Sequence, residues 1–189
     1  MTPSATADLP PASSLQEILE SSKSSIEGSP HPVYLHNLAS TIIHDLQFQH
    51  DWTALSVHIH STLTNDPLPR PIISGLPPKR AYIHPDEQIE IIKEEHKTGE
   101  KIIHKPEREW VLPSHIQEKW SLAKFAAVFD GLDVVPSGTG DNHDEEENPI
   151  GQQWRGKNRQ KRLLLATLHD DSTVVYYIVH DGIVKPRQN

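Results

Sequence analysis

The sequence predicts an α/β (α+β) fold in which helices flank a β-sheet. Three observations lead to this class. Apolar residues recur at helical spacing in 34–49, whereas apolar and polar residues alternate in 52–60. Near the end of the chain, 163–168 and 174–179 are short apolar runs separated by a polar turn, which is typical of a hairpin.

The first helix is predicted from an apolar stripe in YLHNLASTIIHDLQFQ. The stripe consists of Leu35, Leu38, Ile42 and Leu46. The next segment, WTALSVHIH, is expected to be a half-buried strand because its apolar residues alternate with polar ones. Residues 80–83 and 109–112 look like two further short strands.

Two more helices are predicted from signals at their ends. Pro85 opens a helix that has two acidic residues in its first turn and that Gly99 ends. Ser114 and Gln117 form a capping-box pattern for a helix that would end at Gly131. The apolar stripe of this helix contains Ile116, Trp120, Ala123 and Ala127, widened by Leu122, Phe125 and Phe129.

Three segments are expected to lie outside helices and strands. The proline-rich 65–78 reads as an extended connector, because proline removes a backbone donor and disfavours helix before it. A disordered tail is predicted for 1–32 and a flexible insertion for 133–158, since both are polar and lack apolar periodicity. One domain over 33–189 is the consequence.

The predicted hairpin is apolar on both faces. Side chains alternate along a strand, so both faces of 163–168 and 174–179 need cover. The chain's own helices could cover both faces, or a partner could cover one. The tip, 169–173, carries two adjacent carboxylates, which is ordinary turn chemistry.

Composition excludes several classes of function. The 189 residues contain no cysteine, which rules out disulfides and thiolate metal sites and suits a reducing compartment. The formal net charge is -8 with histidine neutral, so the chain is not expected to hold nucleic acid by itself. No apolar run approaches a membrane span, and neither a secretory signal nor a transit peptide is expected.

The histidine, acidic and basic side chains of the sequence form no known catalytic or cofactor motif. His58 and His60 share a strand face, but a third metal ligand at a known spacing is missing, so an exposed strand face is favoured. The His–Asp pairs at 169–170 and 180–181 are better explained as turn residues. A basic cluster could contact a phosphate backbone or be a solvated entry to a strand. It consists of Arg155, Lys157, Arg159, Lys161 and Arg162.

Three longer segments carry a family resemblance. They are RAYIHPDEQIEII, EWVLPSHIQEKWSLAKFAAVFDGL and HDDSTVVYYIVHDGIVKPRQN. Together they resemble the small non-catalytic subunit, subunit fifteen, of the eukaryotic tRNA-splicing endonuclease in its filamentous-fungal form. The resemblance covers roughly residues 33–189 and implies a mixed β-sheet flanked by helices, like the C-terminal nuclease-like domain of that enzyme.

The resemblance also implies a role without catalysis. In that family four related subunits assemble as two heterodimers, and two of the four cut precursor tRNA with a Tyr, a His and a Lys and without metal. Lys161 falls just before the strand that begins at 163, where the active subunits hold their Lys, whereas the Tyr and His motif has no counterpart here. No catalytic residue, metal or cofactor is therefore expected.

The family implies two contacts with other subunits. The final strand would bury apolar residues against the 3′-site-cutting subunit, and the acidic loop before it would enter a basic cleft of the 5′-site-cutting subunit. Precursor tRNA would be contacted indirectly. The partner-binding residues would be His169, Asp170, Asp171, Ser172, Thr173, Val174, Val175, Tyr176, Tyr177 and Ile178.

Two other functions stay open on the sequence. One is a small RNA-cleaving enzyme that uses His and Lys residues, and the other is an unrelated protein-interaction module. Localisation in the nucleus is expected, with the cytosolic face of mitochondria as the alternative.

Overall fold

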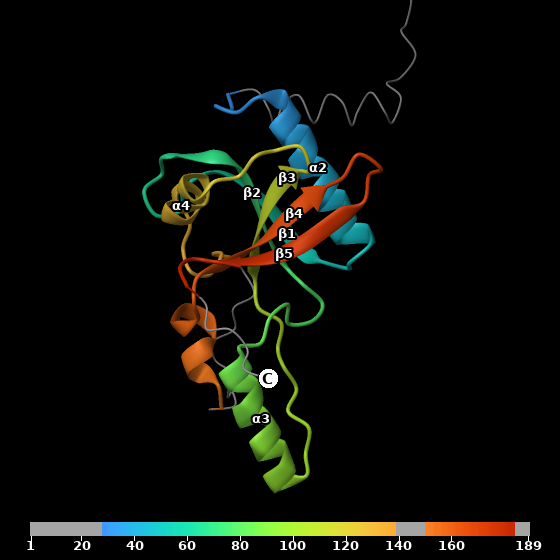
Figure 1. Ribbon diagram of the computed structural model, residues 1–189, viewed down its shortest axis with the longest axis vertical. Coiled ribbons are helices and arrows are strands. Elements are labelled where there is room, and N and C mark those ends of the chain that lie inside the picture. Colours follow the sequence, from blue (N-terminus) through green and yellow to red (C-terminus); the bar gives the residue numbers. More distant parts are fainter. Residues whose placement is uncertain (1–27, 139–149, 184–189) are drawn as a thin grey trace, which may run out of the picture. The chain divides into compact units, whose positions relative to one another are not determined.

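Five strands form one mixed sheet in the computed structural model of the chain, which describes residues 28–138 and 150–183 (Figure 1). Their order across the sheet is β1-β2-β3-β4-β5. β3 and β4 run parallel, and the other neighbouring pairs are antiparallel. The strands are β1 (Thr53–His60), β2 (Pro67–Leu76), β3 (Glu109–His115), β4 (Arg162–Leu168) and β5 (Val174–His180).

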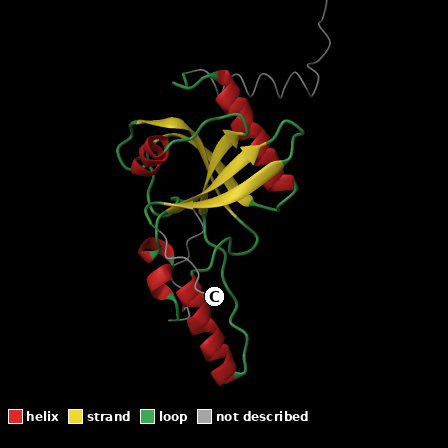
Figure 2. Ribbon diagram, in the orientation of Figure 1, coloured by secondary structure: helices red, strands yellow, loops and turns green. Residues whose placement is uncertain are grey.

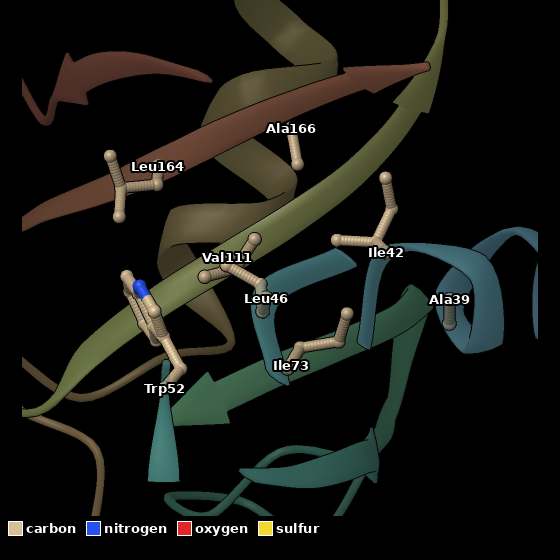
Figure 3. Close-up of a cluster of buried hydrophobic side chains, with 8 residues drawn as sticks. All are labelled: Ala39, Ile42, Leu46, Trp52, Ile73, Val111, Leu164 and Ala166. Carbon is tan, nitrogen blue, oxygen red and sulfur yellow. The ribbon is translucent and has the colours of Figure 1, made fainter. Parts of the chain in front are cut away.

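Helix α2 (Val33–Phe48) covers one face of the sheet, as its predicted stripe requires. Leu35, Leu38, Ile42 and Leu46 are all buried. Figure 3 shows how the α2 side chains meet the sheet residues of this core. The buried members of the cluster are Ala39, Ile42, Leu46, Trp52, Ile73, Val111, Leu164 and Ala166.

Helix α4 (Leu122–Asp130) packs over the opposite face, so the sheet lies between α2 and α4 (Figure 2). A second core cluster lies between α4 and the sheet and contains Leu68, Ile72, Trp110, Leu112, Val128, Phe129, Leu132 and Leu163. The Trp110 indole is fully buried and donates a 2.9 Å hydrogen bond from Nε1 to the carbonyl of Asp133. The predicted class, an α+β fold with helices flanking a mixed sheet, is confirmed.

Helix α3 (Pro85–Thr98) has the predicted end signals. The ring of His84 accepts a hydrogen bond from the Asp86 backbone amide, and Gly99 ends the helix at φ +75°, which favours glycine. The helix extends away from the end of the sheet, beside two short 3₁₀ helices, η1 (Gln152–Trp154) and η2 (Gly156–Asn158) (Figure 1). Residues 150–158 of the predicted insertion therefore have defined secondary structure, while 139–149 lie outside the described residues.

The proline-rich 65–78 was wrongly predicted as a connector, because most of it is β2, an interior strand of the sheet. Its three prolines, at every second position from Pro67, precede the β2–β3 ladder, which begins at Ile73. Proline therefore removes no donor from that ladder. Ile72 and Ile73 are both fully buried at the centre of the sheet.

Two other boundaries differ from the prediction. Residues 80–83 form no strand, and the capping-box helix begins later than expected. Ser114 instead extends β3 opposite Thr167, and its hydroxyl accepts a 2.7 Å hydrogen bond from the Trp120 indole. α4 is capped by Ser121, and Gly131 follows its last residue as predicted.

Contacts divide the chain into two units, residues 1–30 and 31–189, and nearly all described residues belong to the second. Within the part of the chain that the structure describes, no helix has both the length and the apolar character needed to cross a membrane.

Candidate functional site

Strand β5 lies at the edge of the sheet and pairs with β4 throughout its length. The register runs from Leu168 opposite Val174 to Arg162 opposite His180, which confirms the predicted hairpin. β5 is the last strand in the sheet order, so its outer edge has no strand partner among the described residues. An edge of this kind presents unpaired backbone donors and acceptors to another chain.

The two faces of the hairpin contribute to different cores. Leu164 and Ala166 of β4, with Val174 and Tyr176 of β5, belong to the core beneath α2. Leu163 and Leu165, with Val179, belong to the core beneath α4. The chain's own helices therefore cover part of both faces, and the uncovered part lies along β5.

Tyr176 faces α2 and is tied to it. Its hydroxyl donates a 2.6 Å hydrogen bond to Asp45 Oδ2, and the His50 ring meets the phenol edge-on with centroids 5.2 Å apart. Burial, together with the hydrogen bond to Asp45 and its charge, raises the pKa of the Tyr176 phenol well above its ordinary value. This tyrosine therefore attaches β5 to α2 within the chain.

Tyr177 and Ile178 are the exposed apolar residues of β5. The Tyr177 side chain alternates with that of Tyr176 and is 55% exposed, and Ile178 is 36% exposed. Val174 and Val175 are half-buried. An exposed aromatic residue next to an unpaired strand edge has the composition of an interface anchor.

The loop between β4 and β5 is a tight turn. The His169 amide donates to the Thr173 carbonyl over 2.8 Å, and Ser172 takes a positive φ of 68°. Asp171 accepts the Thr173 amide at 3.0 Å, and this backbone hydrogen bond, more than any other cause, lowers the pKa of its carboxyl. Residues 170–173 are exposed, so the loop presents its charges to solvent.

Asp170 also contacts other residues of the chain, which the sequence did not indicate. Gln117 Nε2 lies 3.3 Å from Asp170 Oδ1, and His115 Nε2 lies 3.5 Å from the same oxygen. The Asp170 side chain is nevertheless 69% exposed. These contacts orient the loop and leave its carboxylates accessible.

The basic cluster is not the solvated patch that the sequence left open, because its three arginines are held in largely buried ion pairs; contact with a phosphate backbone, the other alternative, stays a prediction. Arg155 Nε pairs with Glu87 at 2.7 Å. Arg159 and Arg162 both pair with Glu107 and Glu109, and the shortest of these contacts is 2.6 Å. Charges from residues 80–109 and 155–162 are therefore paired between α3, β3 and the start of β4.

Glu87 and Glu107 are central to this ion-pair network. Glu87 is fully buried between Arg80 and Arg155, and each of these arginines pairs with Oε1 at 2.6–2.7 Å. Burial alone would raise the pKa of Glu107. The charges of Arg80, Arg159 and Arg162 and the Gly156 amide outweigh that effect and lower it.

The structure describes two residues that the sequence singled out, His58 and Lys161. His58 is half-buried, hydrogen-bonded to Ser74 Oγ at 2.8 Å and edge-on to Trp110, so the expected open strand face is wrong for His58. Within the described residues, no group of three or more His, Cys, Asp or Glu could hold a metal ion. Lys161 does not line the cavity that its neighbours Gln160 and Arg162 line.

Comparison with known proteins places the chain in a family. The family described as Sen15 protein matches residues 41–189. The chain belongs to the Sen15 family. A Neurospora crassa protein named probable tRNA-splicing endonuclease subunit tsp-1 is 51% identical over 156 residues, which cover 82% of this chain and 67% of that protein. A Schizosaccharomyces pombe protein named probable tRNA-splicing endonuclease subunit sen15 is 27% identical over 146 residues, 77% of this chain and 78% of that protein.

Proposed function

We propose that this Sen15-family chain is a structural subunit of a tRNA-splicing endonuclease and supports removal of introns from precursor tRNA through assembly. The observation that carries the proposal is the edge strand β5, whose outer edge has no strand partner among the described residues and whose Tyr177 is 55% exposed. The choice of complex rests on the two relatives, which are both named as tRNA-splicing endonuclease subunits.

The heterodimer contact follows from β5. A partner strand pairs with the free edge, and the partner's apolar side chains cover Tyr177 and Ile178. The 3′-site-cutting subunit is the proposed partner. The 169–173 loop, with exposed Asp170 and Asp171, meets a basic cleft of the 5′-site-cutting subunit and joins the two heterodimers.

Substitutions at two neighbouring tyrosines would test the heterodimer contact. Tyr177→Asp places a charge on the exposed face and should leave folding intact while abolishing co-purification with the partner. Tyr176→Asp places a second carboxylate beside Asp45 in a half-buried site and should unfold the subunit. Circular dichroism and co-purification separate the two effects. A folded Tyr177→Asp subunit that pairs normally would refute the β5 interface.

The proposed role leaves catalysis to other subunits. Metal-free RNA cleavage needs a base at the 2′-hydroxyl, an acid at the leaving oxygen and a cation on the phosphate. His50, Lys79 and Tyr176 do line one cavity, of about 280 Å³. However, the Tyr176 hydroxyl donates to Asp45 and its pKa is raised, so it is a poor base near neutral pH.

A cleavage assay decides between the structural role and the RNA-cleaving enzyme. The purified chain at high concentration should leave intron-containing precursor tRNA intact. Cyclic-phosphate ends that disappear in Lys161→Ala or His50→Ala would establish the enzyme instead. Stable capture of proteins unrelated to the endonuclease, with no endonuclease subunit, would favour the unrelated interaction module. Localisation in the nucleus, or on the cytosolic face of mitochondria, stays a prediction that imaging of a tagged chain would test.

A further inference from the structure

A cavity of about 290 Å³ opens at the end of the sheet opposite the 169–173 loop, and β5 does not need it for its proposed contact. Four aromatic or imidazole rings from separate segments line it. Tyr82 and His84 precede α3, Trp154 belongs to η1, and His180 ends β5. We call this the ring cavity. Its volume is near the lower limit for small-molecule sites, which suits one small planar group.

The rings lie in two ordered pairs. His84 and Trp154 are stacked, with an interplanar angle of 9° and centroids 5.4 Å apart. Tyr82 meets His180 edge-on at 5.0 Å. All four side chains are only half-buried, so ring surface remains open to a ligand. Flat aromatic surface of this kind is what proteins use to stack the bases of single-stranded nucleic acid.

Positive charge lies directly behind the rings. The Arg162 guanidinium is 5.1 Å from the centre of the Tyr82 ring, and both Arg159 and Arg162 line the cavity. Their network joins four arginines to three glutamates, so it carries one positive charge in excess. The Arg159 side chain is fully buried, and its Nε has no hydrogen-bond partner. An excess buried cation favours an anion at the opening, although the whole chain carries a net charge of -8.

Two amides at the rim add hydrogen-bonding groups. The Asn158 and Gln160 side chains each donate to their own subunit's backbone, at the carbonyls of Gln152 and Asp181. These bonds fix the amide planes beside the rings. Rings for stacking, fixed amides and a cation together match a base linked to a phosphate better than they match either group alone.

We propose that the ring cavity binds one nucleotide of single-stranded RNA, with the base against the rings and the phosphodiester at the opening, where the excess positive charge of the network around Arg159 and Arg162 attracts it. The inference deepens the proposed function, on which it rests, because it assigns this subunit a direct contact with the RNA substrate. The contact is weak in the isolated chain, since one nucleotide and a single excess charge give little affinity.

The test is fluorescence anisotropy of a labelled single-stranded oligoadenylate octamer, titrated with the full chain at low salt. Saturable binding is expected. Trp154→Ala and Tyr82→Ala should each weaken it by roughly 5- to 150-fold, the effect of losing one stacking ring. Tyr34→Ala is the matched control, because Tyr34 is 63% exposed and lies on α2. It should leave binding unchanged, and thermal midpoints should show that all three variants fold.

Several outcomes would overturn the inference. They are absence of binding at millimolar chain, equal losses in Tyr82→Ala and Tyr34→Ala, or complete displacement of the RNA by an equal concentration of inorganic phosphate or of a phosphoserine peptide. Trp154 lies on η1 and not on β5, so Trp154→Ala should still co-purify with the endonuclease. A wild-type chain that co-purifies with the endonuclease but does not bind the RNA would defeat this inference alone, and lost co-purification of the wild-type chain would defeat the proposed function.

Discussion

The Tyr176 hydroxyl lies 2.6 Å from Asp45 Oδ2 and connects the edge strand β5 to helix α2 across 131 positions of sequence. An edge strand has half the backbone hydrogen bonds of a central strand, so its side chains carry more of its attachment. Tyr176 supplies that attachment from one face, while Tyr177 on the other face remains exposed. Adjacent tyrosines thus have opposite roles, one within the subunit and one proposed for a partner.

Tyr176→Phe should lower the free energy of unfolding by about 1–2 kcal/mol, because Asp45 loses a donor but keeps some access to water. At this chain length the thermal midpoint should fall by roughly 2–8 °C. Tyr177→Phe is the control and should stay within about 0.5 kcal/mol, since its ring is at the surface. Equal stability of the two variants in thermal unfolding would contradict the assigned role of Tyr176.

Glu87→Ala should destabilise the fold by about 3–5 kcal/mol, because it leaves Arg80 and Arg155 buried without their shared carboxylate. The midpoint should fall by roughly 6–20 °C. Glu90→Ala, an exposed glutamate on the same helix, is the matched control and should change little. If both variants have the same thermal midpoint as the wild-type chain, the buried network does not hold α3 and 150–158 in place.

Local patterns predicted α2, α3 and the closing hairpin well. The stripe of α2, the ends of α3 and the alternation in β4 and β5 are all short-range signals, and each matches the structure. β2 was missed because its prolines suggested a connector, and whether a proline disrupts a ladder depends on which neighbouring strand it faces. The sheet topology decides which strand pairs with which, and the sequence of a single strand does not reveal it.

In the candidate site, too, local features were predicted and long-range contacts were not. Tyr176 and Tyr177 were both among the predicted partner-binding residues, and the hydrogen bond of Tyr176 to Asp45 shows which of the two faces the chain's own helix α2. The basic cluster looked solvated in the sequence because its counter-charges are distant along the chain. Glu87 is 68 positions from Arg155, and Glu109 is 53 from Arg162. Charges that neutralise one another in the fold are invisible to local patterning.

Stability should fall as the pH is lowered below about 6.5, because burial lowers the pKa of His31, His58, His104 and His180 from that ordinary value. The unfolded chain then takes up protons that the folded chain resists, so stabilisation present above pH 6.5 is lost as the pH falls through the lowered values. Glu107 adds a further loss below about pH 4.5, since its pKa is also lowered.

Urea unfolding at several pH values between 7.5 and 5 would measure this decline. His58→Gln should flatten it, because glutamine can still bond Ser74 but does not titrate. A free energy of unfolding that rises as the pH drops from 7 to 5.5 would contradict the assignment of neutral buried histidines.

Asp170→Asn with Asp171→Asn should separate the two heterodimers without unfolding the subunit. Asparagine keeps the turn geometry that Asp171 provides to the Thr173 amide, and both carboxylates are exposed, so monomer stability should change by less than about 1 kcal/mol. In a basic cleft the same carboxylates would be desolvated and hydrogen-bonded, and their loss there should cost about 2–5 kcal/mol of assembly. The variant should therefore still pair through β5 and fail to form a tetramer.

Light scattering after size-exclusion chromatography of four co-expressed subunits would measure that outcome, and splicing activity should fall with the tetramer. Gln117→Ala is the control, because it removes only the internal contact to Asp170 and should leave the mass of the complex unchanged. Wild-type assembly should also weaken in higher salt, since exposed charges are screened as they approach the cleft. A full-mass, active tetramer from the double-Asn variant would show that 169–173 is only a turn.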